Sequence, residues 1–231
     1  MSNVFVAGAT GVLGRRVVSL LVAAGHDVRG VARSPAKAAL LRSLGAEPVE
    51  VDLFDAAAVG AAVEGSDVIV HLATSIPPLS KMRSRRAWRD NDRLRTETTR
   101  HLVDAALAHG IDRVVTESIT FHYVDRGSDW IDEGASTDTA GALDSVGDLE
   151  REVARLTASG GTGVVLRFGL FYGPDARSTG EYLGLARRGL AVTVGSPNGY
   201  ISSIHTDDAA AAVVAAIDAP PASTTSSMTN P

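Results

Sequence analysis

A strand-like apolar run that breaks into three glycines at three-residue spacing lies at the start of the chain. Residues 3–14 read NVFVAGATGVLG, so Gly8, Gly11 and Gly14 come directly after the run and before a stretch with helical spacing. Gly8 permits a sharp turn, Gly11 lets the backbone approach a pyrophosphate, and Gly14 lets the helix pack closely on the sheet. The amides at the start of such a helix stabilise phosphate charge, which favours a dinucleotide-binding turn over an empty structural turn. The loop residues expected to contact the dinucleotide are Gly8, Thr10, Gly11, Val12, Leu13 and Gly14.

The rest of the chain repeats the order of strand and helix. The early strand-like runs show almost no polar alternation, as expected for strands that are covered on both faces. Right-handed crossovers between such units predict an α/β fold, a Rossmann-like doubly wound parallel sheet with helices on both faces. The predicted strands are Val4–Ala7, Val28–Ala32, Pro48–Val51, Val68–Leu72, Arg113–Thr116 and Gly163–Arg167. The predicted helices are Val12–Ala24, Ala36–Leu44, Ala56–Val63, Asp92–Ala108, Ser145–Thr157 and an alanine-rich helix that ends at Ile217.

Composition narrows the class of protein. The 231 residues are 45% hydrophobic, enough for one domain, which we expect over residues 1–219, followed by an irregular tail at 220–231. The net charge of −5 argues against a nucleic-acid partner, and the absence of cysteine excludes disulfides and thiolate metal sites and suits the cytoplasm. No apolar run reaches the roughly 18 residues of a membrane span, and strand-like sequence from Val4 leaves no room for a signal peptide. We expect a soluble cytoplasmic monomer or homodimer with a small-molecule substrate.

Three segments interrupt the repeating pattern on the side where such sheets bind ligands. They lie near residues 75–91, 125–144 and 173–203, and we interpret them as substrate-side insertions. The first combines two prolines with a basic run, and the second is acidic and rich in turn residues. Loops of this length are often functional lids. For the basic run, a solvated helix start is an equally good interpretation.

The end of the second predicted strand bears on the choice of dinucleotide. An acidic residue there would bond the ribose hydroxyls of NAD, but none lies between Val28 and Ser34, and Arg33 can pair with a 2′-phosphate instead. NADP is therefore preferred over NAD, with an exposed arginine that has no ligand as the alternative. Asp52 and Leu53, after the third strand, are placed to flank the adenine, although this stretch also reads as a helix N-cap.

Several ordered motifs carry a family resemblance. They are GATGVLG at 8–14, DL at 52–53, VIVHLAT at 68–74, Asn91, VVTESITFHY at 114–123, LRFGLFYGP at 166–174 and IHTDDAAAA at 204–212. Over about residues 3–218 the chain resembles an extended short-chain dehydrogenase/reductase of the NAD(P)-dependent epimerase/dehydratase family.

The resemblance implies roles for particular residues. Leu72, Ala73 and Thr74 would line the ribose side of the cofactor, and the segment from Phe168 to Tyr172 would lie near the nicotinamide and the substrate. Asn91 would lie in the helix that supports the site. His205 and Asp207 would be structural residues in the segment that returns the chain to the sheet.

The usual chemistry of this family needs a tyrosine followed four residues later by a lysine. The chain has only two lysines, Lys37 and Lys81, and neither follows a tyrosine at that spacing. The expected helix carries Ala142 and Val146, or Asp144 and Asp148 in a shifted alignment, in place of the pair.

Ser118 and Tyr123 are the remaining catalytic candidates. Ser118 stands at the position of the family's catalytic serine or threonine and could bond a substrate oxygen, while Tyr123 could donate a proton. The alternatives are a strand-end hydroxyl that caps the local backbone and a tyrosine that only packs. Glu117 and His122 beside them are expected to be polar loop residues, with His122 a candidate proton carrier.

Two classes of function follow. One is an atypical NADP(H)-dependent oxidoreductase, a reductase or an epimerase/dehydratase-like enzyme acting on a small carbonyl or sugar-like substrate. The other is an NADP(H)-binding redox sensor or scaffold with little or no turnover. Because hydride transfer depends mainly on orientation by the protein, loss of the tyrosine–lysine pair lowers activity without forbidding it.

The C-terminal stretch DAPPASTTSSMTNP has no apolar periodicity, so we expect it to be extended or disordered. Members of the family usually continue with a strand containing Tyr-Asn-Val and then a small substrate-covering lobe. GC-rich codons for residues 221–231 can be read in a shifted frame as ASIYNVVDDEP, which resembles that strand. One hypothesis is therefore a frameshift near Pro220 that truncated the substrate lobe, and a natural terminus is the alternative.

Overall fold

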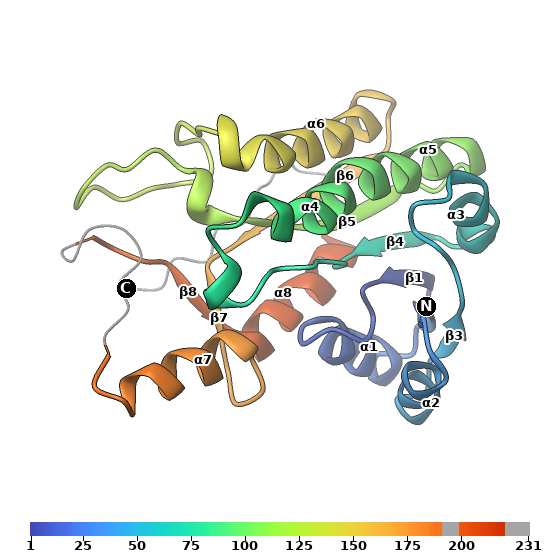
Figure 1. Ribbon diagram of the computed structural model, residues 1–231. Helices are drawn as coiled ribbons and strands as arrows, with labels where there is room; N and C mark the ends of the chain where they lie inside the picture. The colour runs from blue at the N-terminus through green and yellow to red at the C-terminus, as the bar shows by residue number, and fades with distance from the viewer. Residues whose placement is uncertain (191–198, 220–231) are drawn as a thin grey trace.

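Six parallel strands form the central sheet of the computed structural model, which describes residues 1–190 and 199–219 (Figure 1). The strand order is β3-β2-β1-β4-β5-β6, so the chain moves outwards from β1 in both directions. The predicted doubly wound parallel sheet is confirmed. The predicted tail at 220–231 lies outside the described residues. The strands are β1 Asn3–Ala7, β2 Asp27–Val31, β3 Glu47–Val49, β4 Val68–His71, β5 Arg113–Ile119 and β6 Thr162–Phe168.

Helices cover both faces of this sheet. Figure 1 shows α5 and α6 on one side and α1 and α8 on the other. The helix α3 packs with α5, and α1 packs with α8. In the described part of the chain, no helix combines the length and the apolar character needed to cross a bilayer. The α-helices are α1 Gly14–Ala23, α2 Pro35–Ser43, α3 Ala56–Val63, α4 Arg85–Arg93, α5 Thr99–His109, α6 Asp144–Ala158, α7 Arg177–Ala186 and α8 Thr206–Asp218.

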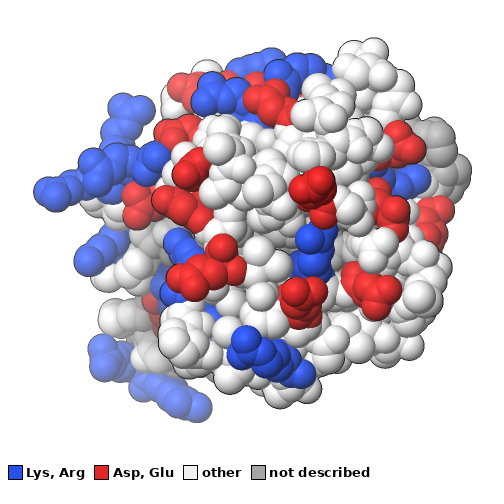
Figure 2. All heavy atoms as spheres, turned by 90° about the vertical axis from the view of Figure 1, so that its right-hand side faces the viewer, with Lys and Arg blue, Asp and Glu red and all other residues white. Residues whose placement is uncertain are grey.

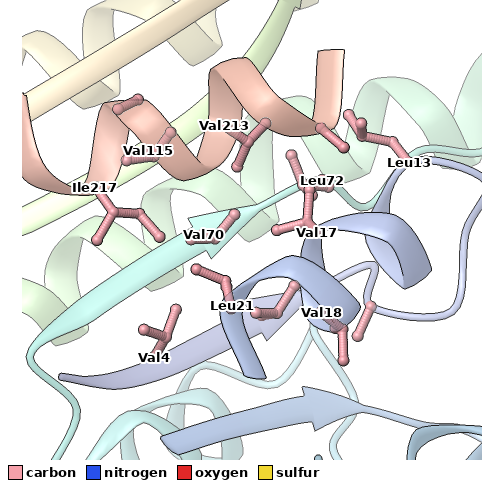
Figure 3. Close-up of a cluster of buried hydrophobic side chains, with 14 of the residues drawn as sticks. Val4, Leu13, Val17, Val18, Leu21, Val70, Leu72, Val115, Val213 and Ile217 are labelled. Carbon is pink, nitrogen blue, oxygen red and sulfur yellow. The ribbon is translucent and has the colours of Figure 1, made fainter. Parts of the chain in front are cut away.

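The core is divided between the two faces of the sheet. On one face, Val17 and Leu21 of α1 lie opposite Val213 and Ile217 of α8, with Val70 of β4 beneath them (Figure 3). The other face buries apolar side chains of α3 and α5 against the same strands. Burial on both faces explains the near-continuous apolar strand sequences.

The helix predicted over 92–108 differs from the structure. Helix α4 begins earlier, at Arg85, and a π-helical turn, Leu94–Thr98, joins it to α5. Much of the basic run at 75–91 is therefore helical: one part forms a short 3₁₀ turn at Leu79–Lys81, and another part forms α4. This agrees with the alternative interpretation of the run as the start of a helix. Arginine and alanine are good helix formers, so the local preference of residues 85–87 agrees with this result.

A second, two-stranded sheet follows β6. Strand β7, Leu170–Tyr172, pairs in parallel with β8, Ser203–His205, and α7 lies between them in the chain. Helix α8 then returns to the main sheet and packs on α1. The ring nitrogen Nδ1 of His205 accepts a hydrogen bond from the amide of Asp207 and caps α8, which is a structural role.

Candidate cofactor site and active site

The glycine turn after β1 is held by backbone packing. Gly8 has a φ of +85°, and a Cβ on it would lie 2.4 Å from the carbonyl carbon of Leu72. A Cβ on Gly14 would lie 2.1 Å from the carbonyl oxygen of Gly8, so the first turn of α1 rests directly on the loop. On Gly11 a Cβ would meet only the carbonyl oxygen of Gly8, at 3.3 Å, among the described atoms. Gly8 and Gly14 thus permit close packing, while Gly11 faces open space.

An open cavity of about 150 Å³ lies beside this turn, at the carboxyl ends of β1, β2 and β4. Most of the predicted cofactor residues line it, namely Gly8, Thr10, Gly11, Arg33, Asp52, Leu53, Leu72, Ala73 and Thr74. The cavity also takes in Val31, Lys37, Phe54 and Leu94, which the sequence interpretation did not single out. Residues from five separated segments therefore meet where a doubly wound sheet binds its ligand.

Other predicted cofactor residues are not among those that line the cavity. Leu13 is buried in the core beside α1. Phe168 is also buried, and its ring centroid lies 5.5 Å from that of Phe171. Val12 is half-buried, and its carbonyl oxygen accepts a hydrogen bond from Arg16. A direct contact of Leu13 or Phe168 with a cofactor stays a prediction.

Two cationic side chains stand at one end of the cavity. Arg33 is exposed at the end of β2, and Lys37 follows it in the first turn of α2. Neither side chain makes a hydrogen bond or an ion pair within residues 1–190 and 199–219. The sequence signal for Lys37 is its place in the first turn of the helix that follows β2, close in the chain to Arg33.

Asp52 and Asp55, the acidic residues after β3, make different contacts. The carboxylate of Asp55 accepts hydrogen bonds from the amides of Ala57 and Ala58 and caps α3. Asp52 accepts a hydrogen bond from the amide of Phe54, at 3.0 Å, and lines the cavity. The N-cap alternative therefore belongs to Asp55 rather than to Asp52.

The two catalytic candidates meet at a buried ion pair. Ser118 lies in β5, is 4% exposed, and its Oγ donates a hydrogen bond to Oε1 of Glu150 in α6 at 2.8 Å. Nη2 of Arg167 in β6 donates to Oε2 of Glu150 at 2.7 Å. Nη1 of the same guanidinium donates to the phenol oxygen of Tyr123 at 2.9 Å. Ser118 and Tyr123 are therefore held by opposite ends of one ion pair, which the sequence interpretation did not identify.

Charge pairing in this cluster opposes the cost of burial. Burial alone would raise the pKa of Glu150, but hydrogen bonds from Arg167 and Ser118 outweigh it and lower that pKa. The same pairing outweighs burial to raise the pKa of Arg167. Burial lowers the pKa of His122, whose Nε2 lies 3.6 Å from Oε1 of Glu150. At neutral pH the cluster thus contains one carboxylate, one guanidinium and one neutral imidazole.

The positions expected for the family's tyrosine and lysine carry other side chains. Ala142 lies exposed in a 3₁₀ turn, Gly141–Leu143, and Val146 is fully buried in α6. In the shifted alignment Asp144 is exposed and Asp148 pairs with Arg151. None of these side chains supplies a phenol or an ammonium group.

Charge is mixed on the one face of the molecule that Figure 2 shows. On the face that forms the right-hand side of Figure 1, acidic and basic side chains are interspersed, and neither sign covers it (Figure 2).

Comparison with known proteins identifies relatives over nearly the whole chain. A family model described as NAD(P)H-binding matches residues 8–220. A 3-diazoavenalumate denitrifying reductase from a Streptomyces species is 37% identical over 228 residues, which cover 94% of this chain and 72% of the relative. A 2-alkyl-3-oxoalkanoate reductase from Shewanella oneidensis is 29% identical, over 94% of this chain and 58% of the relative.

Solved structures show the same fold. The UDP-glucuronic acid 4-epimerase from Bacillus cereus, in complex with UDP-glucuronic acid and NAD, matches with a TM-score of 0.79 and 17% identity, over 99% of this chain and 78% of that one. The UDP-glucose 4-epimerase of Thermus thermophilus, in complex with NAD, matches with a TM-score of 0.76 and 20% identity, over 95% of this chain and 75% of that one. The chain belongs to the NAD(P)H-binding family, and it shares its Rossmann-like fold with these solved structures.

Proposed function

We propose that this chain binds NADP(H) in the cavity beside the glycine turn and reduces a small electrophilic substrate next to Ser118 and Tyr123. The observation that carries the cofactor part is the pair of cations, Arg33 and Lys37, on a cavity wall whose β2 side has no carboxylate. A 2′-phosphate needs such cations, whereas the free ribose hydroxyls of NAD are usually bonded by a carboxylate at this strand end.

The other walls of the cavity suit the remaining parts of a dinucleotide. Gly11 presents open backbone at the start of α1, where amide groups favour a pyrophosphate. Leu53 and Phe54 offer apolar surface for an adenine ring beside Asp52. Leu72, Ala73 and Thr74 follow β4 and would contact the ribose that leads to the nicotinamide.

NADP(H) is expected to bind at least tenfold more tightly than NAD(H), because one charge-assisted contact to the 2′-phosphate contributes about 1.4 kcal/mol or more. Arg33→Ala should remove most of this preference and leave NAD(H) binding unchanged. Isothermal titration of each cofactor measures both effects. Lys81→Ala is the control, since Lys81 is exposed in the 3₁₀ turn at Leu79–Lys81 and is not among the cavity residues. Equal affinities for the two cofactors in the unaltered protein would contradict the NADP assignment.

The protein groups can support reduction without the usual tyrosine–lysine pair. The bound cofactor would supply the hydride. Tyr123 accepts a hydrogen bond from Arg167, so its own phenolic proton is available to a substrate atom that gains negative charge. Ser118 would orient the same atom from the end of β5. The two reductases named above act on a diazo compound and on a 3-oxo acid by their names, and both of those substrates are carboxylates.

At saturating NADPH, kcat should depend on Ser118 and Tyr123 and not on either lysine. Ser118→Ala and Tyr123→Phe are each expected to lower kcat about a hundredfold, the size typical of a missing acid–base or orienting group, with the dissociation constant of NADPH unchanged. The assay follows NADPH oxidation against aldehydes, ketones and 3-oxo acids. Tyr182→Phe, on α7, is the matched control. Loss of turnover in Lys37→Ala or Lys81→Ala with intact cofactor binding would show that the active site has been misidentified.

A sensor or scaffold that binds NADP(H) is the second candidate. The observation in its favour is that the positions expected for the tyrosine and lysine are taken by exposed Ala142 and buried Val146, while Ser118 Oγ already donates to Glu150. Tight NADPH binding without oxidation across the whole substrate panel would favour this function over the reductase.

A further inference from the structure

Arg95 is a buried cation that the site described so far does not use. It lies in the π-helical turn between α4 and α5 and is 6% exposed. π-Helical turns of this kind are frequent at functional sites. The other buried arginine of this region, Arg167, donates hydrogen bonds to both carboxylate oxygens of Glu150 and to Tyr123. The side chain of Arg95, by contrast, makes no hydrogen bond and no ion pair with any residue that the structure describes.

Leaving a guanidinium buried and unpaired is costly. An ion that lies mostly in the protein interior without a partner loses much of its hydration, and arginine cannot escape that cost by losing its proton. The nitrogens of Arg95 keep contact with solvent, since none of them is among the fully buried unpartnered atoms of the described residues, so they are open to a ligand. The charges that act on Arg95 are those of Glu117 and Asp92, neither of which is within ion-pair distance. Asp92 is engaged elsewhere, since its Oδ1 accepts a hydrogen bond from Ser145. Burial raises the pKa of Glu117 to about 7, so this carboxyl is only partly ionised at neutral pH. It therefore supplies only part of a counter-charge for Arg95.

The position of Arg95 connects the two parts of the site. It comes directly after Leu94, which lines the cofactor cavity. The charge of Arg95 also acts on His122, whose Nε2 lies 3.6 Å from Oε1 of Glu150, the residue that binds Ser118. Asn91, one turn earlier in α4, accepts a hydrogen bond from the amide of Ser75, the residue after the cavity-lining Thr74. A substrate next to the cofactor and to Ser118 would therefore lie within reach of Arg95.

We infer that Arg95 binds a carboxylate group of the substrate, so that the physiological substrate is an organic acid. The inference rests on the proposed function only in placing the substrate beside Ser118. A planar carboxylate can accept two parallel hydrogen bonds from the guanidinium, which supplies the missing counter-charge. Recognition of this kind also rejects neutral analogues, because they leave the cation unpaired.

The test compares each acid with its methyl ester, a pair that differs in charge and little else. Isothermal titration uses the full chain saturated with NADP⁺, with 3-oxohexanoate and cinnamate as the acids and their methyl esters as the neutral partners. We expect at least one acid to bind about thirtyfold more tightly than its ester, the size of one charge-assisted bidentate contact. Arg95→Met should weaken the acid to the level of the ester and leave the ester unchanged, and Arg95→Lys should give an intermediate acid affinity.

Arg93→Met is the matched control, because Arg93 lies two residues away but is partly exposed and pairs with Glu97. It should leave the ratio of acid to ester affinity unchanged. Thermal unfolding adds an independent readout. If Arg95 is held unpaired for a ligand, Arg95→Met should keep or raise the Tm of the ligand-free protein, whereas a structural pair with Glu117 would make the same change lower it by several degrees.

The inference is overturned if both acids bind no better than their esters, if none of the four compounds binds, or if Arg95→Met keeps the preference for the acid. A fall in Tm with an unchanged ratio of acid to ester affinity would assign Arg95 a structural role instead. Because the titration does not require turnover, failure of the reductase function is distinguishable: the acid would still bind through Arg95 but would not cause NADPH oxidation.

Discussion

Replacing Gly8 by alanine is expected to lower the free energy of unfolding by about 4 kcal/mol or more and to abolish cofactor binding. A Cβ at this position would lie 2.4–2.6 Å from three backbone atoms of Leu72 and Ala73. Backbone atoms at the end of a central strand cannot move aside as a flexible side chain can. The turn after β1 would have to separate from the end of β4, which opens the cavity wall. Urea unfolding measures the loss of stability, and titration with NADPH measures the loss of binding.

Gly25→Ala separates the cost of a side chain in the left-handed conformation from the cost of the contact with the end of β4. Gly25 follows α1 and has the same φ of +85°, but a Cβ there would have no atom within 4 Å among the described residues. Its substitution should cost only the left-handed conformation, about 1–2 kcal/mol. Gly11→Ala should cost about 1 kcal/mol or less but reduce dinucleotide affinity at least tenfold, because its Cβ would occupy the approach to the pyrophosphate. Equal costs for Gly8→Ala and Gly25→Ala would show that the contact with β4 does not limit this position.

Removing the carboxylate of Glu150 is the second substitution with a large expected effect. Glu150→Ala should lower the free energy of unfolding by about 3–5 kcal/mol, because it leaves Arg167 buried without a counter-charge. Ser118 and Tyr123 would lose their common support, so turnover should fall as well. Denaturant unfolding at pH 7 gives the free energy. The control is Asp148→Ala, two residues earlier in α6, whose partner Arg151 is exposed, with an expected cost of no more than about 1 kcal/mol.

The cost of Glu150→Ala should also depend on pH in a defined direction. The pKa of Glu150 in the folded protein is below its ordinary value of 4.5, so the charged pair stabilises the protein above that pH. As the pH falls through the lowered pKa, the carboxyl becomes protonated in the folded state and the contribution is lost. The difference in the free energy of unfolding between the unaltered protein and Glu150→Ala should therefore become smaller below about pH 4. The double variant Glu150→Leu with Arg167→Met removes both charges. It should lose less free energy of unfolding than the sum of the losses in the two single variants. Additive losses would argue against an interaction between the two side chains.

Most of the fold could be predicted from sequence because its signals are local. The apolar runs that became β1 and β4 are buried on both faces, and a run of this kind is visible without any knowledge of its neighbours. The transition from α4 to α5 could not be predicted in this way. One extra residue in the turn Leu94–Thr98 breaks the helical period, and its cause is tertiary: Leu94 accepts a hydrogen bond at its carbonyl from His71 of β4.

The candidate site likewise contains residues that local motifs predict and residues that only tertiary packing brings together. The glycine turn and Arg33 belong to short motifs, so the position of the cofactor cavity followed from the sequence. Glu150 and Arg167 are 17 residues apart and lie in a helix and a strand. Arg167 belongs to the motif LRFGLFYGP, but nothing in that motif indicates Glu150 as its partner. Their pairing depends on how α6 packs against β5 and β6, which only the structure shows.

The wide turn at Leu94–Thr98 sets the orientation of α4 relative to that of α5, because the backbone stays helical from α4 through the turn into α5. Helix α5 is fixed by Leu102 and Val103, which are fully buried against the sheet, whereas α4 directs Asn91 towards the backbone of Ser75. Each residue added to or removed from a helix rotates everything on one side of it by roughly 100°. Loss of one residue from this turn would swing Asn91 away from the segment after β4 and leave α5 in place. A change in the length of this turn can thus reorient α4 and Asn91 without any change in their side chains.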